Sequence, residues 1–152
     1  MVCKYDEKAI MKIDLEHFLP YQLNQLATKI SDDFASVYQK KYNLTISQWR
    51  IVANLAQFGQ SNARELCSLA IMDKSTVSRA IKTLTDQGYL VTQLSKQDKR
   101  ATHVMLNQRG KELYQRISQD AKIWEEQLAV NLSKHEQEQL LSLLIKLKAS
   151  FK

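Results

Sequence analysis

The sequence predicts a mainly α-helical fold with a small β-wing, and three features of the chain indicate it. Long segments toward both ends repeat apolar residues every three or four positions, the spacing of a helix that buries one face. Two short segments, 89–94 and 101–106, alternate apolar and polar residues as paired strands do. One Pro and three Gly in 152 residues leave little chain for linkers.

The first helix is expected over residues 14 to about 40. Its apolar stripe comprises Leu15, Leu19, Leu23, Leu26, Ile30, Phe34 and Val37. Pro20 stands within this stripe, and a proline inside a helix removes a backbone hydrogen bond. Either a kink or the start of the helix therefore lies near Pro20.

Two shorter helices are expected next, each opened by a capping box, in which a cap side chain and a residue three positions later bond reciprocally. Thr45 with Gln48 opens the second helix, Gly59 ends it, and Asn62 with Glu65 opens the third. The side chains expected to face inward are Trp49, Val52, Ala53, Leu55, Ala56, Leu66, Leu69 and Ala70.

A polar and basic helix follows, with Asp73 as its cap and Gly88 just after its end. Val77, Ile81 and Leu84 recur on one face and are expected to be buried. The exposed faces then carry Ser75, Thr76, Ser78, Arg79 and Lys82. Short hydroxyls beside Arg and Lys suit contacts with phosphates and base edges in a DNA major groove.

The charge distribution favours the same interpretation. The net charge is +6, and residues 41–110 hold ten basic and four acidic side chains, while the flanks are close to neutral. A localised basic patch is typical of proteins that bind polyanions. The alternative is an ordinary solvated basic surface.

The strands at 89–94 and 101–106 flank a polar loop, Ser95 to Arg100. A hairpin with a charged tip, next to a groove-reading helix, is a wing, so the predicted fold is a winged helix-turn-helix.

Two more helices complete the chain. Asn107 caps the first, whose stripe is expected to be Leu113, Ile117, Ala121, Trp124, Leu128 and Leu132. Ser133 and Glu136 form another capping box, and the last helix is apolar over more than one face, with Phe151 extending it. Exposed apolar surface is costly, so a second copy of the chain is the expected cover. We expect one continuous domain, with residues 45–106 as the winged DNA-binding lobe and 1–44 and 107–152 as long helices for dimerisation.

The chain resembles the multiple antibiotic resistance regulator (MarR) family of bacterial transcription regulators. The resemblance rests on four segments in order: Leu44-Thr45-x-x-Gln48-Trp49-Arg50, Asp73 to Arg79, Leu84 to Gly88, and Asp98-Lys99-Arg100-Ala101. One departure is Asn107, where the family usually has Thr, and both residue types cap helices.

The resemblance implies a homodimer that binds double-stranded DNA, with the polar helix in the major groove and the wing in the adjacent minor groove. Arg100 would enter the minor groove while Asp98 holds its guanidinium, although the pair alone is also compatible with an exposed turn contact. The implied DNA-binding residues are Lys74, Ser75, Thr76, Ser78, Arg79, Lys82, Asp98, Lys99 and Arg100.

The resemblance also implies a repressor of a pseudo-palindromic operator, released by a small aromatic or phenolic effector. The candidate effector residues, which are otherwise core, are His17, Phe18, Pro20, Tyr21, Tyr38, Trp49 and Met72.

Other functions are disfavoured. Catalytic, cofactor and metal sites are not expected, because no nucleotide-binding Gly loop, nucleophile elbow or metal-ligand spacing occurs. No apolar run reaches the roughly 18 residues of a membrane span, so a cytoplasmic protein is expected. Two alternatives stay open: a winged-helix protein-interaction module without DNA binding, and a redox regulator using Cys3 or Cys67, the latter more simply a buried thiol.

Overall fold

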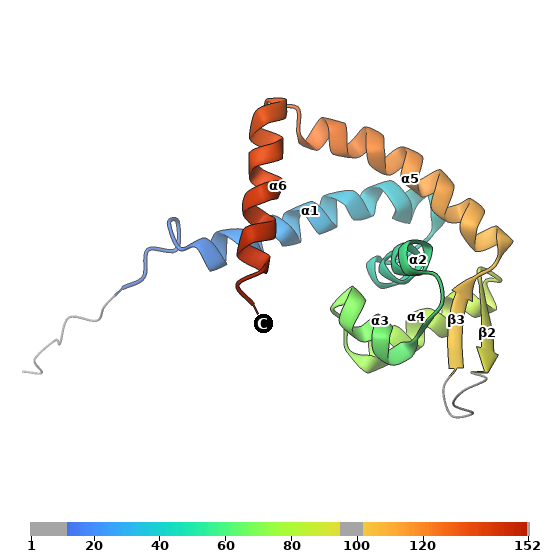
Figure 1. Cartoon of the computed structure of the whole chain (residues 1–152). Coiled ribbons are helices and arrows are strands. Elements are labelled where there is room, and N and C mark those ends of the chain that lie inside the picture. Colours follow the sequence, from blue (N-terminus) through green and yellow to red (C-terminus); the bar gives the residue numbers. More distant parts are fainter. Residues whose placement is uncertain (1–11, 95–101, 152) are drawn as a thin grey trace, which may run out of the picture. The chain divides into compact units, whose positions relative to one another are not determined.

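The computed structural model describes residues 12–94 and 102–151 (Figure 1). These residues fall into two compact units divided after Asp33. The described elements are α1 (Leu19–Tyr42), α2 (Ile46–Phe58), β1 (Ser61–Asn62), α3 (Ala63–Ala70), α4 (Lys74–Asp86), β2 (Leu90–Leu94), β3 (Thr102–Leu106), α5 (Gln108–Leu128) and α6 (Lys134–Lys148). The chain is thus mostly helical with one small sheet, as the sequence predicts.

In the first unit, the structure shows that Pro20 marks a helix start. Helix α1 begins at Leu19, so the expected start at residue 14 is wrong. Residues 15–17 form a turn, where Nδ1 of His17 lies 2.7 Å from a carboxylate oxygen of Asp14. A proline is tolerated in the first turn because its missing N–H has no helical partner there.

The second unit holds the hydrophobic core. The end of α1, the three short helices, the sheet and the first half of α5 all contribute to it. Its fully buried large side chains are Tyr38, Leu44, Ile51, Leu66, Leu84, Ile117, Val52 and Val77. Ile51 was not among the expected inward residues of α2, and Leu69 was, but 39% of Leu69 is exposed. Leu69 instead faces outward on α3, whose inward side is formed by Leu66 and Ala70.

The sheet has three antiparallel strands in the order β1-β3-β2. The hairpin pairs Leu90 with Leu106 and Leu94 with Thr102, which confirms the two predicted strands. Strand β1 was not predicted, and it pairs Ser61 with Val104 and Asn62 with His103. The start of α3 is therefore attached to the central strand of the wing.

The predicted capping boxes at Thr45, Asn62 and Ser133 are all present. Gly88, with φ +74°, ends α4 in a Schellman motif: its N–H donates to the Thr85 carbonyl and the Tyr89 N–H to the Leu84 carbonyl, both at 2.9 Å.

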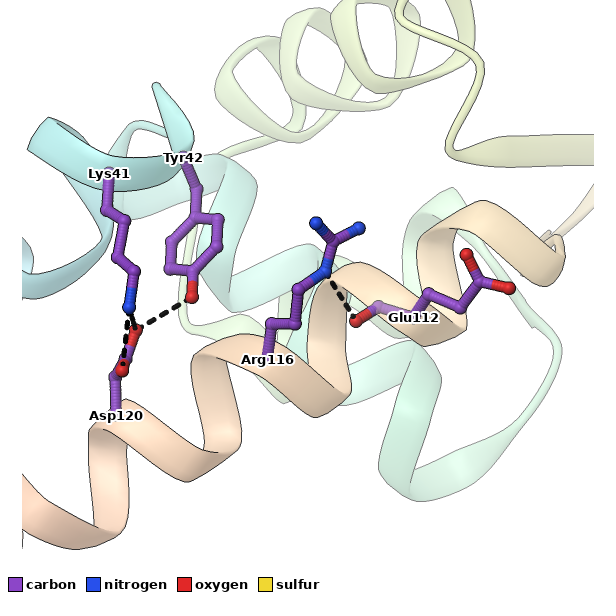
Figure 2. A network of polar contacts seen from close by, with 5 residues as sticks. All are labelled: Lys41, Tyr42, Glu112, Arg116 and Asp120. Atoms are coloured by element: carbon purple, nitrogen blue, oxygen red, sulfur yellow. Dashed lines mark hydrogen bonds and ion pairs between the residues drawn. The ribbon is translucent and has the colours of Figure 1, made fainter.

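The end of α1 is joined to the middle of α5 by a polar network (Figure 2). The Lys41 ammonium lies 2.8 and 3.0 Å from the two carboxylate oxygens of Asp120, and the Tyr42 hydroxyl donates to one of them at 2.7 Å. Both donors hold the pKa of Asp120 below its usual value, and Asp120 raises the pKa of Lys41.

An aromatic cluster joins α1, α2 and α5 in the same unit. Tyr38 stacks on Trp49, with ring centroids 5.6 Å apart, and Trp49 stacks on Tyr114 at 6.0 Å. Phe34 contacts Tyr38, Trp49 and also Trp124, whose centroid is 4.7 Å away. Such contacts add stability beyond area burial, so the cluster fixes the packing of these three helices.

The last two helices expose much of their apolar surface. Helix α5 ends at Leu128, so Leu132 lies outside the helix in which its stripe was expected, and 38% of it is exposed. Helix α6 ends at Lys148, before Phe151, and buries no residue. None of the described helices is both long and apolar enough to cross a membrane.

Candidate nucleic-acid interface

Helices α3 and α4 form the helix-turn-helix, and α4 carries the predicted reading face. Val77, Ala80 and Leu84 are buried against the lobe, and Ile81 is half-buried. The opposite side is solvent-exposed, apart from Thr76, which is half-buried. Six of the predicted DNA-binding residues lie on this helix: Lys74, Ser75, Thr76, Ser78, Arg79 and Lys82.

Asp73 fixes the first turn of α4. Its carboxylate accepts three hydrogen bonds, from the Thr76 N–H at 2.9 Å, the Thr76 hydroxyl at 2.6 Å and the Ser75 hydroxyl at 2.7 Å. These donors, with the two hydroxyls first in effect, hold the pKa of Asp73 far below its usual range. The carboxylate is therefore charged throughout the neutral range and orders the end of the helix that precedes the reading face.

The cap also determines which hydroxyl groups of α4 can still donate a hydrogen bond to another partner. The hydroxyl protons of Ser75 and Thr76 are committed to Asp73, so each hydroxyl presents lone pairs outward. The Ser78 hydroxyl takes no part in this cap. The Nε of Arg79 donates to the Ser75 carbonyl at 3.3 Å, which orients its exposed guanidinium along the helix.

The acidic side chains at the starts of α3 and α4 are engaged in capping, and Asp86 lies at the far end of α4. Glu65 accepts from the Asn62 N–H at 2.9 Å, and Asp73 accepts the three bonds above. No acidic residue occurs between Lys74 and Thr85, and Arg64 adds an exposed cation on α3. The exposed side of α4 from Lys74 to Thr85 therefore carries positive charge only, as a phosphate-binding surface requires.

The wing residues Asp98, Lys99 and Arg100 lie outside the described residues. The described residues on either side of them, Leu94 and Thr102, are paired in the hairpin. Strand β2 is exposed from Val91 to Leu94. At its base, the Arg109 guanidinium lies 5.5 Å from the centroid of the Tyr89 ring.

Comparison with known proteins agrees with this geometry. A model of the MarR family matches residues 42–101. A crystal structure of a MarR/EmrR family transcriptional regulator from Acinetobacter sp. ADP1 is 29% identical, with a TM-score of 0.80 over 91% of this chain and 97% of that one. Both comparisons show that the chain is similar to MarR family transcriptional regulators.

A curated relative and a further solved structure are also similar to this chain. HTH-type transcriptional regulator Hpr of Bacillus thuringiensis (strain Al Hakam) is 26% identical over 99 residues, which cover 65% of this chain. The chain spans about half the length of the curated relatives it matches, 54% for Hpr. The structure of NadR in complex with 4-hydroxyphenylacetate, 21% identical, has a TM-score of 0.75 over 91% of this chain and 97% of that one, and shows the shared fold.

The departure from the MarR pattern at position 107 preserves the cap. The Asn107 side chain accepts from the Gly110 N–H at 3.0 Å. Its amide N–H also donates to the Gly88 carbonyl at 2.9 Å. A threonine at this position has no side-chain amide with which to make this bond. Asn107 therefore ties α5 directly to the end of α4.

The candidate effector residues are divided between the two units. Tyr38, 1% exposed, and Trp49 are packed together in the aromatic cluster, and Met72 is half-buried against the core. His17, Phe18, Pro20 and Tyr21 lie in the first unit, where all four are exposed. For Tyr38 and Trp49 the structure thus shows the core position that was the alternative interpretation.

The next features are the cysteines and the possible metal ligands. Cys67 is half-buried on α3, packs against the core and is a free thiol, and Cys3 lies outside the described residues. Among residues 12–94 and 102–151, no group of three His, Cys, Asp or Glu side chains is arranged to hold a metal ion. Arg64 and Arg109 are both exposed and were not among the predicted DNA-binding residues, since neither lies in the polar helix or the wing loop.

Proposed function

We propose that this chain is a member of the MarR family and a sequence-specific regulator of transcription that binds double-stranded DNA. One observation carries the proposal: α4 buries its apolar side and turns Ser78, Arg79 and Lys82 outward with no carboxylate among them. A helix with this surface supplies donors for base edges and cations for phosphates.

In the proposed complex, α4 lies in the major groove and Arg79 contacts a base edge, while Lys74 and Lys82 bind phosphates. Arg64 on α3 extends the phosphate contacts. Arg100 of the wing enters the minor groove with its guanidinium held by Asp98, and Lys99 adds charge there. Ser75 and Thr76, whose protons are committed to Asp73, accept hydrogen bonds.

The proposed active form is a homodimer. Helix α6 exposes Leu140, Leu141, Leu143, Leu144 and Ile145, each by 42–62%. In the first unit, Leu19 and Leu26 are exposed by more than half. A twofold pairing would cover such surfaces and would match a pseudo-palindromic operator.

The proposal includes repression, by occupancy of an operator, and release by a small aromatic or phenolic effector. Two structures with the same fold support this extension: NadR in complex with 4-hydroxyphenylacetate, and Bordetella bronchiseptica BpsR, whose DNA binding is regulated by 6-hydroxynicotinic acid. Thermal-shift titration with aromatic carboxylates and phenols, repeated with operator DNA present, tests it. An effector must raise the melting temperature of the free protein and weaken DNA binding.

The DNA-binding proposal is tested by selecting an operator from random duplexes and measuring its affinity across a salt series. Affinity should fall steeply with salt as counterions are released. Arg79→Ala should weaken binding to the selected duplex roughly tenfold to hundredfold. The matched control is Arg116→Ala, which removes an exposed guanidinium from the middle of α5 and should leave affinity unchanged (Figure 2).

Each alternative has its own signature in these measurements. Weak binding that does not respond to salt would favour the protein-interaction module. Loss of affinity on thiol alkylation or oxidation would favour a redox regulator. Arg100→Ala should weaken binding most when the operator has A·T-rich flanks, and an equal loss on every sequence would contradict minor-groove insertion.

A further inference from the structure

The exposed side of α4 changes its hydrogen-bonding character along its length. Ser75, Arg79 and Lys82 recur at spacings of four and three, so they share one side of the helix, and all three are exposed. The Arg79 and Lys82 side chains can only donate hydrogen bonds. A serine hydroxyl can in general donate as well as accept, so the character of the Ser75 end depends on where its proton lies.

The Ser75 hydroxyl is left with acceptor capacity only. It donates its single proton to Oδ1 of Asp73 at 2.7 Å, and its lone pairs remain available. Hydrogen bonds to a charged acceptor are roughly twice as strong as neutral ones, so the hydroxyl gains nothing by turning its proton toward another neutral group. The Thr76 hydroxyl donates to Oδ2 of the same carboxylate at 2.6 Å. Asp73 therefore sets the orientation of both hydroxyls.

An acceptor-only hydroxyl on a groove-reading helix restricts the partners that it can have on DNA. Phosphate oxygens accept hydrogen bonds and cannot donate to it. In the major groove, guanine presents the N7 and O6 acceptors and thymine presents the O4 acceptor, whereas adenine and cytosine present the N6 and N4 amino groups as donors. The Ser75 hydroxyl therefore matches adenine or cytosine and does not match guanine, thymine or a phosphate.

We propose that Ser75 selects an adenine or a cytosine in each operator half-site, by accepting a hydrogen bond from the amino group of that base. Asp73 is a positioning residue, which acts through the Ser75 hydroxyl and does not touch the base. Arg79, one turn further along the same side, has its Nε bonded to the Ser75 carbonyl at 3.3 Å and keeps its two terminal nitrogens for a neighbouring base. The inference rests on the proposed function, because it requires α4 to lie in the major groove.

The test uses the full chain, the operator selected from random duplexes and the variant Ser75→Ala, which identifies the position whose base preference depends on Ser75. At that position 2-aminopurine replaces adenine, or 2-pyrimidinone replaces cytosine, so that the amino group in the major groove is lost. The replacement should weaken binding of the unmodified chain about threefold to tenfold, the effect of one neutral hydrogen bond, and should not change binding of Ser75→Ala. Comparing both proteins on both duplexes cancels any effect of the analogue on the duplex itself.

Two results would overturn the inference while leaving the proposed function intact. One is salt-dependent binding in which the analogue weakens both proteins equally. The other is a Ser75→Ala variant that selects the same bases as the unmodified chain at every position. Failure of the chain to bind any duplex would instead contradict the proposed function, and the inference with it.

Two substitutions of Asp73 separate the orientation of the hydroxyl from the charge of the carboxylate. In Asp73→Asn, the Thr76 N–H requires the amide oxygen to occupy the place of Oδ1, where it also accepts from Ser75. This variant should therefore keep the preference for the amino group, while its affinity for all duplexes changes by a common factor. Asp73→Gly still caps α4 adequately but frees the Ser75 proton, so the preference should be lost. An unchanged preference in Asp73→Gly would show that Asp73 is a structural cap alone and would overturn its positioning role.

Discussion

Gly110 and Tyr89 approach each other so closely that a Cβ atom on Gly110 would lie 2.3 Å from the Tyr89 carbonyl oxygen. The same atom would lie 3.0 Å from a methyl carbon of Leu106. The Tyr89 carbonyl also accepts from the Asn107 N–H at 3.1 Å, so it is held in place. The first turn of α5 therefore packs directly on the backbone at the base of the wing.

Gly110→Ala should destabilise the protein by about 2 kcal/mol. Alanine gains about 1 kcal/mol of helix propensity over glycine, but the overlap is with backbone that cannot move away without breaking the hydrogen bond from Asn107. Urea unfolding gives the free energy. Gln108→Ala, at an exposed position in the same turn, is the control and should be close to neutral. A Gly110→Ala protein as stable as the unmodified chain would show that this contact relaxes freely.

Ile71→Asn should stabilise the protein by about 1 kcal/mol, because a β-branched residue in the left-handed region is strained and asparagine tolerates that region well. Ile71 caps α3 with φ 52° and ψ 58°, and 86% of it is exposed, so little packing is lost. The control is Ile71→Val, which keeps the branched Cβ and should leave stability nearly unchanged. Equal effects of the two substitutions would point to side-chain exposure rather than backbone strain.

Asp120→Asn should lower stability at neutral pH and lose this effect in acid. The folded state lowers the pKa of Asp120, first through the Lys41 ammonium and then through the Tyr42 hydroxyl. The stabilisation is therefore complete above the ordinary carboxyl pKa of about 4 and disappears as pH falls through the lower folded value. The difference between the unfolding free energies of the two proteins should therefore shrink as pH falls from 7 to 3. A constant difference would mean that the Asp120 charge is not responsible.

Leu144→Glu should weaken self-association by at least about tenfold, since a carboxylate would have to be desolvated in an apolar contact. Leu144 is 42% exposed on α6, so the folded monomer can accommodate the change. Ser142→Glu is the matched control, because Ser142 shares the polar side of α6 with Gln139 and Lys146 at spacings of three and four. Sedimentation velocity across a concentration series measures both. Dissociation by both variants alike would place the dimer contact elsewhere.

Much of the fold follows from local sequence chemistry. A capping box has both partners within four residues, so Thr45, Asn62 and Ser133 could be recognised without any knowledge of tertiary contacts. The stop at Gly88 is equally local. The buried face of α4 was predicted because its apolar residues recur with helical spacing.

What could not be predicted depends on contacts between distant segments. Strand β1 is two residues long, too short to show alternation, and exists only because β3 lies beside it. Leu69 matched the expected stripe of α3, but an eight-residue helix offers too few positions to fix which side faces inward. The hydrogen bonds from the Ser75 and Thr76 hydroxyls to Asp73 could not be predicted either. A sequence pattern gives the type of each side chain and not its hydrogen-bond partner.

Both tryptophans of the chain, Trp49 and Trp124, lie in the aromatic cluster that joins α1, α2 and α5. The intrinsic fluorescence of this protein is therefore a probe of a single place in the molecule. Tryptophan emission reports how these three helices are packed. The helix-turn-helix and the wing contain no tryptophan and do not contribute to it. A change in emission on adding DNA or a small molecule would thus show, without any label, that binding alters the packing of the aromatic cluster.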